Sequence, residues 1–223
     1  MNVLIVYVHH EPSSLTSALK NLAIETLSRA GHGVVVSDLY GQGFNPLAQK
    51  WDFVTTTGGH FNYMLEQKHA ARLDLAFSPD ILGEIQKVKA ADLVMFVAPV
   101  WWSSVPALLK GWFDRVLAMG VAWDSGQTYE KGLMRGKQAM LVLSAGAPAD
   151  FYTAQGQYKV TPLQILHPIN HATLAYCGFD VHEPYLVLNA LGLDDAGRAK
   201  ALADLQFRLE HLVDSPNFLA KYS

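Results

Sequence analysis

The feature that most constrains the fold is a continuous apolar run at residues 3–8, rich in β-branched side chains. Such a run is typical of a strand buried on both faces, as in parallel sheets. A polar loop follows it, then an amphipathic helix over 15–30 that ends at Gly31, and a second strand over 33–38. Because this strand–helix–strand unit is compatible only with a parallel crossover, the N-terminal segment predicts an α/β sheet.

The same alternation continues along the chain. The segment 39–77 lacks a sustained period, so we expect it to be irregular apart from one short helix near 62–72. Five strands alternating with helices predict a single domain, residues 1–223, built on a doubly wound five-stranded parallel sheet with helices on both faces. The remaining strands are predicted over 93–98, 137–144 and 179–187, and the remaining helices over 80–91, 105–118, 161–176 and 194–213.

Ligands of such sheets bind outside the carboxyl ends of the strands, at the point where the strand order reverses. In a sheet of order 2-1-3-4-5 this crevice lies between the loops 9–14 and 99–104, and the loop 144–152 forms its far wall. The second loop carries two adjacent tryptophans, Trp101 and Trp102. These rings are candidates for ligand contact, although burial in the core or at a dimer contact would also explain one of them.

Composition narrows the class of partner. The 223 residues are half hydrophobic and carry a net charge of -3, which favours neither a nucleic acid nor an anionic membrane as partner. A single cysteine, Cys177, excludes disulfides within the chain and indicates a reducing compartment. With no signal-peptide pattern and no apolar run of membrane-spanning length, we expect a cytoplasmic protein.

His167 and His171 are four residues apart, but without a third ligand we expect no metal site.

Six motifs spread along the chain belong together: residues 4–11, 37–40, 44–46, 108–116, 152–156 and 176–179. Taken together they resemble the NAD(P)H:quinone oxidoreductase (DT-diaphorase) family, in register through about Val213. The resemblance implies a flavodoxin-like fold, a homodimer with FAD at the subunit interface, and two-electron reduction of quinones by NADH or NADPH.

The resemblance also implies which residues contact the flavin. Asn62 and Arg198 match positions that contact the adenosine and phosphate parts, and Arg198 is the reason to favour FAD over FMN. Hydroxyls beside a helix N-terminus suit a diphosphate, although helix capping alone would also explain Ser13 and Ser14. Three stretches match the family's flavin contacts: His9, Ser14, Leu15 and Thr16; Pro99, Val100, Trp101, Trp102 and Ser103; and Ser144, Ala145, Gly146, Ala147 and Tyr152.

The catalytic residues implied by the resemblance are Tyr152 and Tyr158. Tyr152 matches a tyrosine that donates a hydrogen bond to the reduced flavin, whereas Tyr158 stands where the family has a histidine. Because a phenol titrates near pH 10 and an imidazole near 6.5, Tyr158 is the poorer proton relay, and it could instead gate the pocket. Trp102, Tyr158, Trp123 and Ser125 are expected to line the substrate pocket, the last two from the second subunit in place of two tyrosines.

Two other functions fit the same residues. Some relatives are flavin-binding ancillary subunits of potassium efflux systems, in which the bound flavin or nucleotide signals to a membrane partner. A one-electron flavodoxin is a third possibility, but such carriers are usually shorter, strongly acidic and without an aromatic substrate wall.

Overall fold

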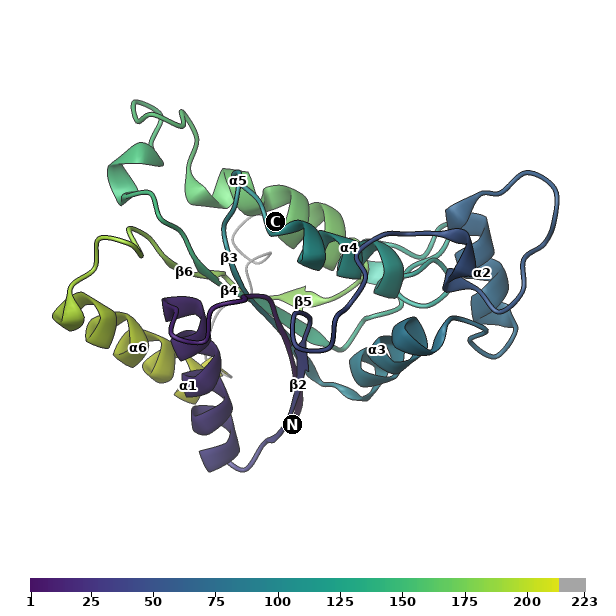
Figure 1. Ribbon diagram of the computed structural model, residues 1–223, viewed down its shortest axis with the longest axis horizontal. Helices are drawn as coiled ribbons and strands as arrows, with labels where there is room; N and C mark the ends of the chain where they lie inside the picture. Colours follow the sequence, from purple (N-terminus) through teal and green to yellow (C-terminus); the bar gives the residue numbers. More distant parts are fainter. Residues whose placement is uncertain (213–223) are drawn as a thin grey trace.

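The computed structural model describes residues 1–212, and its centre is one parallel sheet (Figure 1). The strand order is β2-β1-β3-β4-β5, so the predicted order is confirmed. β6 also pairs with β4, farther along that strand than β5 does. Every pairing is parallel, as expected for strands buried on both faces. The strands are β1 (Asn2–Tyr7), β2 (Gly33–Asp38), β3 (Leu93–Pro99), β4 (Gln138–Ser144), β5 (Asp180–Val181) and β6 (Tyr185–Val187).

Helices cover both faces of the sheet (Figure 1). Successive side chains of a strand point to opposite faces, so β1 feeds two separate cores. Ile5 packs with Leu19 and Leu205 in one core, and Leu4 packs with Ile81 and Leu109 in the other. The first core lies under α1 (Leu15–Arg29) and α6 (Asp195–Glu210), and the second lies under α3 (Pro79–Ala90), α4 (Ala107–Val116), α5 (Pro162–Ile169) and the π-helix η4 (Asn170–Ala175).

Two predicted elements are each divided into two in the structure. The helix predicted over 161–176 is present, but it changes from the α-helix α5 to the π-helix η4 after Ile169. The single strand over 179–187 is two short strands on either side of Pro184, which cannot donate to a ladder.

Capping residues shorten other predicted helices. α4 begins after Pro106 and ends at Val116, so the predicted range 105–118 was too long at both ends. α6 begins after its N-cap Asp194 and ends at Glu210, and the predicted end at Val213 lies outside the described residues. The short helix in the irregular segment is confirmed as α2 (Tyr63–Arg72), and three short 3-10 helices were not predicted: η1 (Lys50–Asp52), η2 (Tyr129–Lys131) and η3 (Ala149–Phe151).

A buried ion pair anchors the irregular segment 39–77 on α4. Arg115 donates from Nη2 to Asp52 Oδ1 at 2.8 Å and from Nε to Asp52 Oδ2 at 3.1 Å. Its Nη1 also lies 2.9 Å from Asp80 Oδ2 and donates to Asn45 O at 2.6 Å. Burial lowers the pKa of Arg115, but the bonds to Asp52 and Asp80 more than reverse this and leave the pKa above its ordinary value. The Trp101–Trp102 loop leads into α4, so this ion pair helps to fix the helix that follows the loop.

Candidate functional site

The three loops predicted to flank the crevice meet at the carboxyl ends of β1, β3 and β4. The sheet register continues into them: Val8 donates to Val97 O at 2.9 Å, and Val100 donates to Ser144 O at 2.7 Å. Thr16 Oγ1 and Ser144 Oγ share a buried hydrogen bond of 2.8 Å across 128 residues of sequence. The structure therefore brings residues of all three predicted flavin-contacting stretches together.

The first loop ends in a helix N-terminus that has the chemistry of an anion site. Ser14 caps α1 by accepting a hydrogen bond from the Ser17 N–H at 3.1 Å. Helix geometry leaves the N–H groups of Leu15 and Thr16 without an intrahelical acceptor, and the first turn contains no acidic side chain. Unpaired donors and the helix dipole both favour an anion here, so this end of α1 fits the diphosphate of a dinucleotide.

A histidine pair connects the first loop to the tryptophan loop. The rings of His9 and His10 stack with centroids 5.0 Å apart, and His10 lies 6.4 Å from Trp101 and 5.8 Å from Tyr40. His9 Nδ1 accepts the backbone N–H of Glu11 at 3.0 Å. Burial, followed by the charge of His10, lowers the pKa of His9 below its ordinary value. His9 is therefore neutral near pH 7, with Nε2 carrying the proton that can be donated to a ligand.

The tryptophan loop is a tight and strained hairpin. Trp101 and Ser104 exchange two backbone hydrogen bonds of 2.9 and 3.0 Å. The two residues between them have positive φ, 51° at Trp102 and 56° at Ser103, which is the pattern of a type I′ turn normally formed by Asn-Gly. Each residue costs about 1–2 kcal/mol in this conformation. The two hydrogen bonds hold the turn in this conformation, and the side chain of Trp102 at its tip is fully exposed.

The third loop supplies two tyrosines in contact. The rings of Tyr152 and Tyr158 meet edge to face with centroids 5.0 Å apart, and Phe151 lies 5.7 Å from Tyr158. Tyr152 is buried, whereas Tyr158 is 39% exposed. Burial, with a contribution from Tyr158, raises the pKa of Tyr152 above its ordinary value. Tyr152 therefore keeps its proton at neutral pH and acts as a hydrogen-bond donor.

The backbone of the third loop is held by the strand next to it. Ala145 donates to Val187 O at 2.8 Å, and the carbonyl of Ala147 accepts from Asn189 at 2.9 Å. A side chain at Gly146 would lie 3.3 Å from Leu191 Cδ1, so the glycine leaves room for the neighbouring loop. Pro99 ends β3 directly beside Ser144, which places the second and third loops in register.

One chain does not bring all predicted site residues together. Asn62 caps α2 by accepting from Leu65 N at 3.2 Å, and α2 lies at the opposite end of the molecule from α6, which carries Arg198 (Figure 1). Trp123 donates from Nε1 to Leu117 O at the C-terminal end of α4, whereas the tryptophan loop precedes its N-terminal end. A ten-residue helix is about 15 Å long. Trp123 is therefore remote from Trp102, and so is its neighbour Ser125, an exposed turn residue.

Two cavities have none of the residues predicted to contact the flavin in their lining. Trp123 and Tyr176, whose ring centroids are 5.5 Å apart, line a cavity of about 450 Å³. A larger cavity of about 1200 Å³ is lined by Tyr129, Thr161, His167, His171 and Phe179, among others. The rings of His167 and His171 stack in its wall with centroids 4.9 Å apart.

Residues 1–212 contain no cluster of three His, Cys, Asp or Glu side chains suited to hold a metal ion. None of their helices is sufficiently long and apolar to cross a membrane.

The missed features of the site are conformational. Positive φ at Trp102, Ser103 and Lys159 was not expected, since none of these residues is glycine. Runs of serine and tryptophan give no sequence signal for such turns, because the usual Gly or Asn is absent.

Comparisons with known proteins agree with this fold and identify the family. The model of a family described as having a flavodoxin-like fold matches residues 1–209. Human ribosyldihydronicotinamide dehydrogenase [quinone] is 44% identical over 186 residues, covering 82% of this chain and 80% of the human one. Rat NAD(P)H dehydrogenase [quinone] 1 is 38% identical over 223 residues, covering 99% and 81%. A crystal structure of a candidate quinone reductase from Klebsiella pneumoniae superposes with a TM-score of 0.92 at 38% identity, covering 97% and 86%.

Proposed function

The chain belongs to the NAD(P)H:quinone oxidoreductase family of flavodoxin-like fold, and on that basis we propose that it is an FAD-dependent NAD(P)H dehydrogenase (quinone). The observation that carries the proposal is the convergence of three loops at the switch point of the sheet, joined by the hydrogen bond between Thr16 and Ser144. When bound there, a flavin supplies the chemistry of accepting a hydride and passing it on.

The residues of the crevice fit the parts of FAD. The capped N-terminus of α1, with Ser14 and the free N–H groups of Leu15 and Thr16, would hold the diphosphate. The backbone of the tryptophan hairpin would face the edge of the ring system, with the exposed Trp102 side chain packing on it. The loop from Ser144 to Tyr152 would form the opposite wall.

Tyr152 is proposed to stabilise charge. Its phenol stays protonated because burial raises its pKa, so it can donate a hydrogen bond where negative charge develops during reduction. Tyr158 packs on Tyr152 and is partly exposed, which favours a role in gating the substrate pocket over one in proton transfer at neutral pH.

The homodimer is part of the proposal. Asn62 and Trp123 lie far from the three loops of their own chain, so they can reach a flavin only if a second copy presents them. Trp123 and Ser125 would then complete the partner's substrate pocket with an indole and a hydroxyl. We further propose a quinone-like acceptor and a cytoplasmic setting, the latter because the single cysteine is buried and unpaired.

The test is turnover by the flavin-loaded protein. We expect the purified chain to bind FAD in preference to FMN and to oxidise NADH or NADPH with a simple benzoquinone. Tyr152→Phe should retain FAD but lower kcat by about tenfold or more, as expected when one donor to a developing charge is removed. Tyr185→Phe is the matched control, since the Tyr185 hydroxyl donates to Ala201 O on α6 and should affect stability rather than rate.

Three outcomes of this test would contradict different parts of the proposal. Release of FMN alone would overturn the choice of cofactor, and an unchanged kcat in Tyr152→Phe would overturn the role of that phenol. Flavin binding with negligible turnover, together with stable copurification with a potassium efflux channel, would favour the ancillary-subunit function instead.

A further inference from the structure

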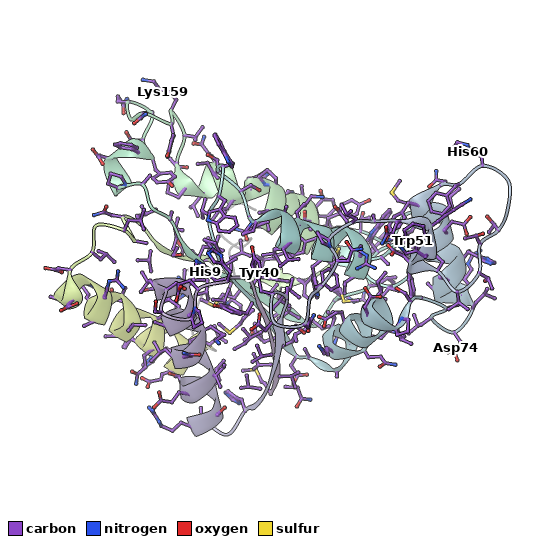
Figure 2. The ribbon with its side chains drawn as sticks, viewed as in Figure 1. His9, Tyr40, Trp51, His60, Asp74 and Lys159 are labelled. Atoms are coloured by element: carbon purple, nitrogen blue, oxygen red, sulfur yellow. The ribbon has the colours of Figure 1, made fainter. Side chains whose placement is uncertain are left out.

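Lys159 occupies a strained position at the outer end of the third loop (Figure 2). We propose that Lys159 determines donor specificity by binding the phosphate groups of a dinucleotide hydride donor, so that NADH and NADPH are favoured over dihydronicotinamides without phosphate. This inference rests on the proposed function, because it assigns a residue to the hydride donor of that reaction.

Backbone strain is the first observation. Lys159 has a φ of 60°, a left-handed conformation that costs a non-glycine residue about 1–2 kcal/mol. Glycine would adopt it freely, so the lysine side chain is retained at a position that disfavours it. Strain of this kind gathers at ligand-binding sites, where the surrounding structure holds it in place.

The loop holds that conformation rigidly. Lys159 donates to Gly156 O at 3.3 Å, and Tyr158 donates to Phe151 O at 3.0 Å, so the chain folds back on η3. A Cβ at Gly156 would lie 2.2 Å from Asp150 O, which shows how closely the two segments approach. These contacts hold the backbone of Lys159 in the fold-back of the loop.

Charge is the second observation. The connections that carry the three loops, each taken from the end of its strand to the next α-helix, span 9–14, 99–106 and 144–161 and contain no arginine and no lysine other than Lys159. The ion pairs among the described residues do not include Lys159. Its ammonium group is thus the one permanent cation of these loops and is available to a ligand.

Position is the third observation. Lys159 directly follows Tyr158, whose ring packs on Tyr152 at the proposed reaction site. A nicotinamide ring held beside these tyrosines would leave its ribose and phosphates directed outward, toward the end of the loop. The N-terminus of α1 would already be engaged by the phosphates of the flavin, so the phosphates of the donor would have to be bound elsewhere, and Lys159 offers a positive charge for them.

The test compares charged and uncharged donors on the FAD-loaded protein. In Lys159→Gly, which removes the charge and suits the positive φ, KM for NADPH should rise about three- to tenfold, the effect of losing one exposed charge-assisted contact. KM for an uncharged N-alkyl dihydronicotinamide should not change. Lys159→Arg should behave like the unmodified protein, and so should Lys89→Ala, which removes an exposed lysine from α3. A rise in KM for both donors, or for neither, would overturn the inference.

A binding measurement separates this inference from the proposed function. The FAD-loaded protein is titrated calorimetrically with ADP-ribose, which carries the diphosphate but cannot transfer hydride. Weaker binding by Lys159→Gly supports the inference even if neither donor is oxidised, in which case the proposed function alone fails. Equal binding by both proteins, or no binding by either, overturns it.

Discussion

Replacing Arg115 with methionine should destabilise the protein severely, because it leaves a carboxylate buried without its cation. The side chains of Arg115 and Asp52 are 3% and 0% exposed. After the change, Asp52 retains only the Tyr63 hydroxyl at 2.6 Å and the Gln49 N–H at 3.1 Å as donors. Removing one partner of such a pair costs about 3–5 kcal/mol, even where methionine fills the same volume.

Urea unfolding measures this loss as a shift in midpoint at constant m-value. The matched control is Lys110→Met, one turn earlier on α4, where an exposed pair with Asp114 should contribute less than about 1 kcal/mol. Adding Asp52→Asn to Arg115→Met should recover part of the loss, because the amide no longer carries a buried charge. A loss below about 1 kcal/mol in Arg115→Met, or strict additivity in the double variant, would refute the proposed role of the pair.

Three further predictions concern stability. Thr16→Val should cost about 1–2 kcal/mol in apoprotein unfolding, since it leaves Ser144 Oγ buried without its partner, and Ser144→Ala should then add little. Gly83→Ala should stabilise α3 by about 0.5–1 kcal/mol because a Cβ there meets open space, whereas Gly111→Ala should destabilise, with its Cβ 2.2 Å from a backbone oxygen; equal melting temperatures would contradict both. Burial, then the charge of Arg208, lowers the pKa of His182. Unfolding therefore takes up a proton below about pH 6.5, and the free energy of unfolding falls as the pH falls through that value. His182→Asn should flatten the dependence of this free energy on pH, measured by urea unfolding between about pH 5 and 7.

Patterns within about ten residues predicted most of the fold. β1, β3 and β4 are apolar runs buried on both faces, as their composition predicted. Alternation with helices indicated a parallel sheet, whereas the strand order was the one expected of a flavodoxin-like fold. Asp52 lies in the segment without periodicity and Arg115 lies 63 residues later on α4, so no local pattern could indicate their ion pair. The π-helix η4 was predicted as helix, but its wider turn was not.

In the site, too, the strands were predictable from local patterns and the conformation of the loops was not. The strands set where its loops begin, since Tyr7 lies opposite Val97 and Pro99 lies opposite Ser144 in a sheet buried on both faces. The loops that follow these strands contain Trp102, Ser103 and Lys159, whose backbone is left-handed. The surrounding structure can hold this conformation at positions where an isolated chain would relax. Side chains there can therefore change without altering the sheet beneath them. Trp101, Tyr158 and Lys159 are such side chains, and we expect them to set which donor and acceptor react rather than whether the crevice forms.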